Sequence, residues 1–523
     1  ARSIGMDQEA DQVVTWLKEH LSDWFTAETN GELDELRYFV YDEEWDTLLG
    51  IEEAYGSHQR LADHHFHYGY FVRAAAEICR QDRSWCSEDQ YGPMVELLIR
   101  DYAGDPGDDM FPPLRNFDPA NGFSWADGKA DALQGNNNES TSEAANSYGA
   151  IILYGLITDN QDLVNKGIYL HASTSAAYWQ YWNNIDGYNN LGADYDNFIP
   201  GYDKITTSII WSAGADFSTW FSPAYAHILG IQGLPSNPLI FHVSQYKDYM
   251  EDYVTLGLSE SSNGKPSGLP EDQWRDLWWN LWAMVDPESA IADYETMAPN
   301  YNTEAGETKA HTYHWLQTFN ALGHIQTGTG DLTANHPAAV AFKKNDEMNY
   351  VAYNFGDAPL EVSYSDGKTF TVPANSFKVE GSTSNEDTTG PLISELDVVS
   401  ENVSDNTLVF DGESVKTIKL RWSLQDPSGI TFETPFGNSR ILLARTDGGS
   451  GGTKSWDLDS LQSERVSGDS TDGYYEKELD LAADQHPSGE FSISLRQVAD
   501  LEGNITTMEI EEGYPLTIVN NSQ

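Results

Sequence analysis

Basic residues are scarce in this chain of 523 residues. It holds 29 Lys and Arg against 83 Asp and Glu, which gives a formal charge of -54 and a pI near 4.2. Such a surface repels nucleic acid and anionic membranes, so we expect neither as a partner. The acidic residues are spread along the whole chain. A hydrophobic content of 39% with 12% aromatic residues is enough for a large core, which argues against disorder.

Cysteine is nearly absent, since only Cys79 and Cys86 occur. The segment between them passes from a helix into a turn, which would allow a disulfide, but two cysteines do not fix the compartment. No run of 18 apolar residues occurs, so no transmembrane helix is predicted. The N-terminus, ARSIGMDQEAD, lacks the apolar stretch of a signal peptide. We interpret it as a processed or truncated start.

A dispersed excess of acid with few lysines is typical of proteins kept soluble in high salt, where screening removes the self-repulsion. We therefore interpret the chain as a halophile's protein. The alternative is an ordinary acidic secreted protein, for which a charge of -54 would be extreme.

The segment DHHFHYGYF, residues 63–71, gathers more chemistry-bearing side chains than any other stretch. It combines a carboxylate, three histidines and several aromatic rings. It leads into a helix with an apolar face of Val72, Ala75 and Cys79. Asp63 and His67 are four residues apart, so on a helical turn they face the same way. We expect this polar cluster to lie at the mouth of a packed helix.

Three interpretations of this segment compete. His64, His65 and His67 could bind a metal, but helical zinc histidines usually stand four residues apart and no pair with that spacing occurs in this segment. The sequence therefore predicts no metal site. The histidines and tyrosines could instead be hydrogen-bonded members of a helix bundle. The third interpretation, which we favour, is acid chemistry on a sugar or a similar polyol.

Residues 1–327 are expected to be mainly helical. Val14, Leu17, Leu21 and Trp24 form the first amphipathic stripe. Long loops rich in Asn, Asp, Gly and aromatic residues favour a toroid of paired helices over a compact four-helix bundle. Further helices are predicted over residues 66–80, 92–103, 139–156, 159–181, 219–229, 274–285, 289–296 and 311–323.

From about Gly328 the pattern changes to the period of two that is typical of strands. Tyr350–Phe355 is a predicted strand, and two more flank the turn Asp366-Gly367, a strong hairpin signal. A polar linker at 381–391 precedes evenly spaced short strands, as in an immunoglobulin-like sandwich. We predict a catalytic domain over 1–327, a small β domain over 328–385 and a sandwich over 386–523.

A second carboxylate cluster lies in GNNNESTSEA, residues 135–144. We expect Asn138 to cap a helix whose first turn contains Glu139, with Glu143 four residues on and on the same face. The helix N-terminus should keep Glu139 ionised, as a general base must be. Aromatic surroundings should raise the pKa of Asp63 and keep its proton available. Two such carboxyls suit cleavage of a glycosidic bond, although a solvated capping turn would also account for the two glutamates.

These segments resemble the family 81 glycoside hydrolases, which are endo-acting β-1,3-glucanases. The chain departs from the family pattern at Asp46, Leu61-Ala62 and Asn138, and the family's N-terminal β-sandwich domain has no counterpart in this sequence. With its acidic surface, the chain is similar to a haloarchaeal member without that domain. The resemblance is carried by DHHFHYGYF, SWADG (124–128), NNNESTSEA, TTSIIWSAGADFSTWF (206–221) and HILGIQGLP (227–235).

The resemblance implies an (α/α)6 barrel with a long open cleft and hydrolysis with inversion, without metal, cofactor or covalent intermediate. Matching motif positions make Asp63 the general acid and Glu139 the base. Glu143 matches the motif's second glutamate and is the alternative base. Otherwise Glu143 and His67 would tune or orient the pair. Residues expected along the cleft, each of whose rings could instead belong to the core, are His65, Tyr68, Tyr70, Trp125, Asp127, Trp211, Asp216 and Trp220.

We therefore expect a secreted, monomeric, salt-adapted endo-1,3-β-glucanase acting on laminarin- or curdlan-type polymers. Its fold would be multidomain, α then β: an (α/α)6 barrel, a small β domain and an immunoglobulin-like sandwich. One rival is another glycan-active hydrolase or lyase on the same barrel type. A second rival is a non-catalytic glucan-binding or surface protein, against which two differently tuned carboxyls argue.

Overall fold

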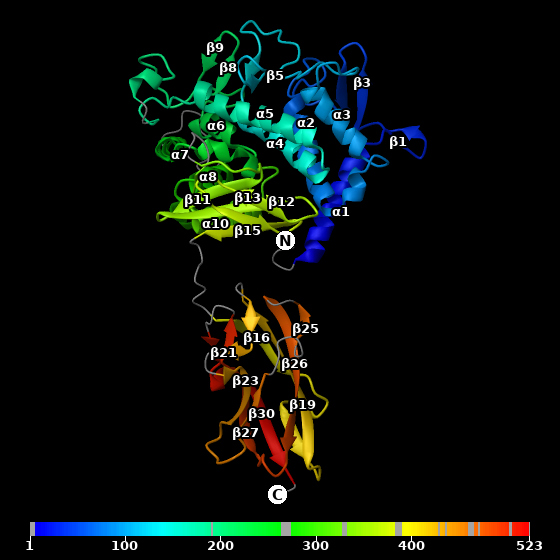
Figure 1. The fold of residues 1–523 in the computed structure, drawn as a ribbon, viewed down its shortest axis with the longest axis vertical. Coiled ribbons are helices and arrows are strands. Elements are labelled where there is room, and N and C mark those ends of the chain that lie inside the picture. Colours follow the sequence, from blue (N-terminus) through cyan, green and yellow to red (C-terminus); the bar gives the residue numbers. More distant parts are fainter. Residues whose placement is uncertain are drawn as a thin grey trace. The chain divides into compact units, whose positions relative to one another are not determined.

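The chain forms two compact units in the computed structural model, residues 1–383 and 384–523 (Figure 1). We describe each unit by itself. The predicted borders at 327/328 and 385/386, and most of the predicted linker, lie outside the described residues. The structure describes residues 6–189, 192–262, 274–326, 332–381, 390–426, 429–434, 437–458, 465–468, 471–500 and 505–521.

Helices dominate the first unit up to Leu322 (Figure 1). Several begin at a Ser, Thr, Asn or Asp that accepts a backbone N–H, as Ser140 and Thr308 do. The helices are α1 (Asp7–Trp24), α2 (His64–Gln81), α3 (Gly92–Ala103), α4 (Thr141–Ile157), α5 (Gln161–Ala177), α6 (Tyr225–Gly230), α7 (Lys247–Ser262), α8 (Arg275–Ala283), α9 (Pro287–Met297) and α10 (Lys309–Leu322).

Short strands interrupt these helices. The pairs are β1 (Glu28–Thr29) with β2 (Glu32–Leu33), β3 (Tyr38–Asp42) with β4 (Thr47–Ile51), and β5 (Phe117–Asp118) with β6 (Phe123–Ser124), while β7 (Asn137–Asn138), β8 (Ile209–Trp211) and β9 (Gly214–Asp216) form a three-stranded sheet.

Most predicted helices are confirmed, and the helix over 92–103 matches α3 at both ends. The helix predicted over 219–229 is shorter, because Pro223 prevents a helix from running through Ser222 and α6 begins only at Tyr225. The pattern missed α7. Whether the helices close into an (α/α)6 ring stays a prediction.

Two apolar cores hold the helices together. One includes Val72 and Ala75 of α2 with Tyr148 of α4, and the other includes Trp278 and Trp279 of α8. Helices α2 and α4 cross closely at Gly69, where an added Cβ would lie 2.5 Å from the Cβ of Ser147. Only glycine permits this approach, which brings the residues after Gly69 toward the start of α4.

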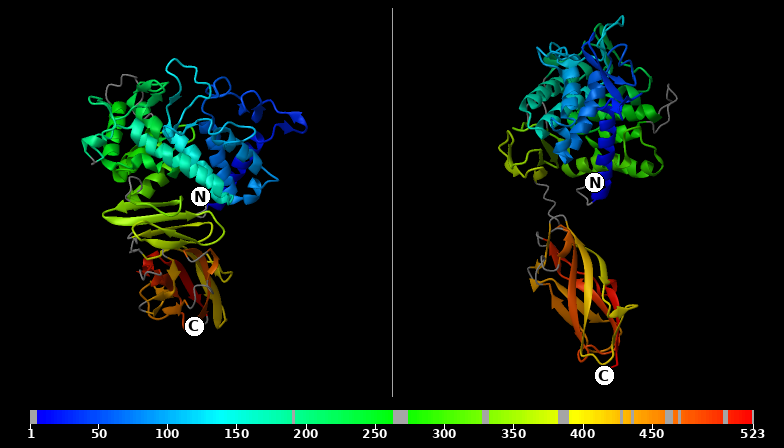
Figure 2. Two further views of the ribbon diagram at one scale, coloured as in Figure 1. Left: turned by 45° about the horizontal axis from the view of Figure 1, so that its top comes forward. Right: turned by 90° about the vertical axis from the view of Figure 1, so that its right-hand side faces the viewer.

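A small sheet completes the first unit (Figures 1 and 2). Its Phe342 joins the apolar core that contains Trp278 and Trp279 of α8. The Asn349 side chain donates to the carbonyl of Leu322 over 2.9 Å. Residues 332–381 thus belong to the same compact unit as the helices, although they also have an apolar core of their own, and the small β domain over 328–385 stays a prediction. The strands are β10 (His324–Ile325), β11 (Ala339–Lys344), β12 (Glu347–Asn354) and β15 (Ser376–Gly381), with the predicted hairpin β13 (Leu360–Ser363) and β14 (Thr369–Val372).

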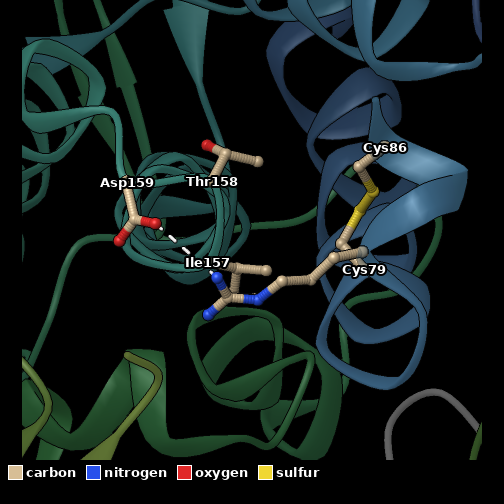
Figure 3. A pocket seen from close by; sticks show the side chains of 6 residues that line it. Cys79, Cys86, Ile157, Thr158 and Asp159 are labelled. Atoms are coloured by element: carbon tan, nitrogen blue, oxygen red, sulfur yellow. Dashed lines mark ion pairs between the residues drawn. A yellow bond between two sulfur atoms is a disulfide. The ribbon is translucent and has the colours of Figure 1, made fainter. Parts of the chain in front are cut away.

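Cys79 and Cys86 form a disulfide between the end of α2 and the following turn. They line a cavity of about 220 Å³ with Arg83 and Asp159 (Figure 3). The Arg83 guanidinium lies 3.6 Å from the carboxylate of Asp159. It also donates over 2.7 Å to the carbonyl of Phe355, which directly follows strand β12 of the small sheet. Arg83 therefore ties the small sheet to two helical segments.

The second unit is a sandwich of two main sheets, ordered β16-β19-β26-β25 and β17-β18-β30-β27-β23-β24 (Figure 2). The predicted alternation is confirmed, because Ile418, Leu420, Trp422 and Leu424 are all fully buried in the shared core. An immunoglobulin-like topology stays a prediction.

The strands of this unit are β16 (Leu392–Val398), β17 (Val403–Ser404), β18 (Thr407–Phe410), β19 (Val415–Gln425), β20 (Ile430–Thr431), β21 (Glu433–Thr434), β22 (Gly437–Asn438), β23 (Arg440–Arg445), β24 (Lys454–Asp457), β25 (Arg465–Gly468), β26 (Asp472–Ala482), β27 (Gly489–Arg496), β28 (Val498–Asp500), β29 (Ile505–Thr506) and β30 (Tyr514–Asn520).

Candidate active site

Asp63 stands immediately before α2 in a left-handed backbone conformation, with φ 60° and ψ 19°. An aspartate at this position normally accepts a backbone N–H of the first helical turn. The Asp63 carboxyl makes no such capping bond. Its side chain is therefore left available to a ligand.

A short antiparallel contact holds the backbone of Asp63. The Asp63 N–H donates to the carbonyl of Ala126 over 2.9 Å, and the Gly128 N–H donates to the carbonyl of Leu61 over 3.1 Å. A Cβ at Gly128 would lie 2.7 Å from the Cβ of Leu61, so this approach requires glycine. The SWADG segment thus positions Asp63 through backbone contacts.

The pKa of Asp63 is raised to about 8, mainly by burial and then by the negative charges of Glu143, Asp127 and Glu139. Arg60 opposes this shift. The predicted direction is confirmed, and the free protein holds a proton on Asp63 at neutral pH. The coupling also shows that these carboxyls are near enough for their charges to interact.

Glu139 lies between β7 and α4, not inside the helix. The prediction that Asn138 caps the helix is wrong. Asn138 pairs with Ile210 in the sheet, and the hydroxyl of Ser140 accepts the N–H of Glu143 instead. Glu139 accepts the backbone N–H of Trp220 over 3.3 Å.

The expectation that the helix N-terminus keeps Glu139 fully ionised is also corrected. Burial raises the pKa of Glu139 to about 7, against the bond from the Trp220 N–H, and the charge of Glu143 adds to the rise. Glu139 therefore changes its protonation state close to neutral pH, at a lower pH than Asp63 does. A carboxylate in that range suits a general base.

Glu143 lies in the first turn of α4 and accepts a hydrogen bond from the Tyr70 hydroxyl over 2.8 Å. Burial raises the pKa of Glu143, opposed by this bond. Tyr70 comes from α2 and is 38% exposed, so it joins the two motifs at the protein surface. The close crossing of α2 and α4 at Gly69 makes this contact possible.

The three histidines of the motif differ in role. His64 is fully buried between Asp101 and the carbonyl of Ser57, at 2.9 and 2.8 Å. His65 is equally buried and bonds Ser124 over 2.9 Å. The structural interpretation therefore holds for these two, and the prediction that His65 contacts substrate is wrong, because it has no exposed surface.

His67 faces a more open region, next to Tyr55 with ring centroids 5.8 Å apart. Burial and the neighbouring His64 lower the pKa of His67 to about 4. It is thus neutral at physiological pH. A neutral imidazole adds no charge to Asp63, and no hydrogen bond between the two side chains occurs within the described residues, so an orienting role of His67 stays a prediction.

Two cavities meet at Tyr70. One of about 530 Å³ is lined by aromatic side chains and by His67. The other, of about 600 Å³, is lined both by charged and polar side chains such as Glu304 and His311 and by apolar ones such as Leu234, and we call it the polar cavity after its carboxylates. Tyr70 lines both, and its hydroxyl reaches Glu143. Tyr70 therefore connects both cavities to the carboxylate cluster through Glu143. The aromatic cavity includes Trp24, Phe39, Tyr55, Tyr68 and Phe71.

Trp211, Asp216 and Trp220 gather beside Glu139. The Trp211 indole N–H donates to Asp216 over 3.0 Å, and the rings of Trp211 and Trp220 meet edge to face at 5.3 Å. Trp220 is 57% exposed. Its backbone N–H contacts Glu139, so this exposed aromatic corner adjoins the second carboxylate.

The other predicted binding residues are less accessible. Tyr68 is only 3% exposed and donates to the carbonyl of Leu48, so little of its ring reaches the aromatic cavity that it lines. Asp127 is 6% exposed and forms an ion pair with Arg60, which leaves it closed to a sugar hydroxyl in this structure. Trp125 is partly buried and donates to Asp118.

Within the described residues, no group of three or more His, Cys, Asp and Glu side chains is arranged to hold a metal ion. Over the same part of the chain, none of the helices has the length and apolarity needed to cross a bilayer.

The arrangement combines two carboxyls that titrate at different pH values with open cavities and exposed aromatic rings. Such a pair can protonate a departing oxygen and deprotonate a water. The sequence patterns did not mark Tyr55 and Arg60, which lie in the loop just before Asp63. They also missed the polar cavity, because its residues lie far apart in the chain and no local spacing marks them.

Comparisons with known proteins agree with this chemistry. The model of the glycosyl hydrolase family 81 C-terminal domain matches residues 2–315. Glucan endo-1,3-beta-D-glucosidases from Thermobifida fusca and Acetivibrio thermocellus are each 37% identical, over 71% and 77% of this chain. They are covered over 47% and 50% of their own length, so the chain spans about half of each of these curated relatives.

A solved structure of a glycoside hydrolase family 81 protein from Clostridium thermocellum, determined as a glutamate-to-alanine mutant, superposes with a TM-score of 0.66. The two sequences are 36% identical, and the match covers 73% of this chain and 50% of the solved chain. The matched domain accounts for more than half of the sequence and contains both carboxylate motifs. The chain therefore belongs to glycosyl hydrolase family 81.

Proposed function

We propose that this protein is a secreted, salt-adapted endo-1,3-β-glucanase with an (α/α)6 barrel. It would hydrolyse laminarin- or curdlan-type polymers with inversion at the anomeric carbon. The observation that carries the proposal is the cluster of Asp63, Glu139 and Glu143, which Tyr70 connects to two cavities. The names of the curated relatives point to the same reaction.

In the proposed mechanism the chain lies across Tyr70. Asp63, protonated below about pH 8, gives its proton to the glycosidic oxygen as the bond to the anomeric carbon breaks. Glu139, ionised above about pH 7, takes a proton from the water that attacks the opposite face of the same carbon. After product release, Asp63 regains a proton from solvent and Glu139 loses one. Glu143 fixes the hydroxyl of Tyr70 and keeps Asp63 protonated through its charge.

Reducing-sugar release from laminarin tests the proposal, with a β-1,4-glucan and a mixed-linkage glucan as comparison substrates. We expect release from laminarin, products free of unsaturated sugars, and α anomers as the first products by proton NMR. Unsaturated products would indicate a lyase, and β anomers would show retention. Tight laminarin binding without release of reducing ends would favour a non-catalytic binding protein.

The pH profile of kcat/KM is expected to be bell-shaped and narrow. Activity should rise through about pH 7 as Glu139 loses its proton and fall through about pH 8 as Asp63 loses its own. Because kcat/KM reports the free enzyme, steady-state rates on a laminarioligosaccharide between about pH 5 and pH 10 measure both limbs, which belong to the coupled pair. A flat profile from about pH 5 to pH 9 would contradict the assignment.

Salt dependence tests the adaptation. A formal charge of -54 leaves a large excess of carboxylates without a basic counterpart, and their repulsion is screened over about 3 Å at 1 M salt. We therefore expect the Tm to rise as salt is raised from dilute buffer to about 1 M. Repeating the series with sucrose separates charge screening from the exclusion of a solute from the protein surface, since sucrose is uncharged. A Tm that does not depend on salt would oppose salt adaptation.

A further inference from the structure

The polar cavity beside Tyr70 is built from residues that the motifs do not contain. Its volume of about 600 Å³ lies within the range of about 300–1,000 Å³ that is typical of ligand sites. It is lined by Tyr70, Trp274, Asp276, Glu304, Glu307 and His311, among others. These residues come from α2, α8, α10 and the loop that precedes α10, so the fold and not the local sequence creates the cavity.

Glu307 and His311 form a fixed pair in this cavity. Nδ1 of His311 lies 2.7 Å from the Glu307 carboxylate, which also accepts the backbone N–H of Thr308 over 2.8 Å. The glutamate side chain is 18% exposed and the imidazole 40% exposed. Because Nδ1 is held by the carboxylate, the other ring nitrogen of His311 is left to bind a ligand as an acceptor.

Asp276 holds the loop that carries Glu304. It is 1% exposed, accepts the Tyr301 hydroxyl over 3.1 Å and accepts the backbone N–H of Glu304 over 2.8 Å. Burial and the charge of Asp276 raise the pKa of Glu304. The exposed carboxyl of Glu304 is thus placed at the rim of the cavity by a buried anchor.

Trp274 supplies an aromatic surface. Its backbone is left-handed, with φ 58°. Its ring packs at 4.4 Å from His227 and at 5.7 Å from Phe221, centroid to centroid, and it remains partly exposed. A ring supported in this way can stack on the apolar C–H face of a pyranose without reordering.

The chemistry of the cavity selects its ligand. Carboxylates and an imidazole acceptor bind hydroxyl donors and repel anions, while the indole offers an apolar face. A neutral sugar presents both surfaces. Tyr70 lines this cavity and bonds Glu143, so a sugar bound here would be continuous with the carboxylate cluster.

We propose that this cavity is a glucosyl subsite, in which Trp274 stacks on the sugar ring and Glu304 and His311 accept its hydroxyls. This subsite rests on the proposed function, and it places the sugar that is bound through polar contacts in the polar cavity beside Tyr70. The aromatic cavity, which Tyr70 also lines, would hold the remaining part of the chain by stacking. His311 is then a specificity-determining residue, oriented by Glu307.

Calorimetric titration of laminarioligosaccharides into the Glu139→Gln variant tests this subsite, since that background should bind without hydrolysing. Adding Trp274→Ala or His311→Ala should weaken binding of laminarihexaose by about tenfold, and Trp274→Phe should restore part of it. His314→Ala is the matched control, because His314 lies exposed on the same helix and does not line the cavity. In the active protein the same changes should raise KM for the hexaose more than they lower kcat.

Circular dichroism and the Tm verify that each variant folds. If an alanine variant does not fold, Trp274→Phe replaces Trp274→Ala and Glu307→Gln replaces His311→Ala. Unchanged affinity in the Trp274 and His311 variants, with the background still binding glucan, would overturn the subsite and leave the proposed function standing. A background that binds no glucan, together with a wild type that hydrolyses none, would overturn both. Equal weakening by His314→Ala would show a general effect of α10 and also overturn the subsite.

Discussion

Replacing Asp63 by asparagine is expected to lower kcat on laminarin by about 10² to 10⁴ and to leave the fold intact. Asparagine is nearly isosteric and tolerates the left-handed conformation of this position, so the backbone contact with Ala126 is kept. What disappears is the proton that the leaving oxygen needs. Reducing-sugar assays with matched circular dichroism measure the two effects separately.

The same substitution should raise stability at alkaline pH. The pKa of Asp63 is about 8 in the folded protein and about 4 in an unfolded chain, so the folded state binds more protons between these values. Stability attributable to this group is complete below about pH 4 and is lost as the pH rises toward about 8. Asparagine removes that loss, and the variant should have the higher Tm at about pH 8.

Asp405→Asn is a suitable control, because Asp405 is also left-handed, with φ 49°, but exposed and in the second unit. It should change neither kcat nor the pH dependence of the Tm. An Asp63→Asn variant with near-native turnover would remove the general acid from the mechanism. Loss of both activity and Tm would instead show a structural role for the carboxyl.

The local patterns in the sequence predicted much of this site. The apolar face of α2 was predicted correctly, since Val72, Ala75 and Cys79 are fully buried. The raised pKa of Asp63 also followed, because a carboxyl beside a packed aromatic helix must lose solvent. Both inferences depend on residues close in sequence, where spacing determines geometry.

Inferences that needed tertiary contacts failed more often. Asn138 was assigned to a helix cap, but its strand pairs with β8, which is far away in the chain, and Ser140 takes the cap. His65 looked like a binding residue because of its chemistry, yet α2 turns it into the core. Histidine and tyrosine in a polar motif do not reveal which side of a helix faces solvent.

The polar cavity shows the same limit. Trp274 was predicted neither in the core nor in the site, and Glu307 and His311 lie more than 160 residues after the nearest motif glutamate. Their meeting with Tyr70 depends on the tertiary arrangement of α2, α8 and α10. No periodicity in the sequence predicts such a contact between distant segments.

Glu139→Gln is expected to lower kcat by about 10² to 10⁴, because glutamine cannot take a proton from water. The Trp220 N–H can still donate to the amide oxygen of glutamine, so the loop should remain in place. The rising limb of the pH profile near pH 7 should vanish, since it belongs to this carboxyl. Initial rates on a laminarioligosaccharide across pH measure both changes.

Glu143→Gln is the matched variant that decides which glutamate is the base. Its charge is the largest of those that raise the pKa of Asp63 and it also raises the pKa of Glu139, so its removal should move the falling limb below about pH 8 and the rising limb below about pH 7 while both limbs are retained. Glutamine can still accept the Tyr70 hydroxyl, which keeps the two helices joined. If instead Glu143→Gln abolished turnover and Glu139→Gln stayed within about tenfold of wild type, the roles would be exchanged. Half-buried against Tyr70, Glu143 would then have to reach water by releasing its hydrogen bond from the Tyr70 hydroxyl, which links α2 to α4. For this reason we assign the base to Glu139.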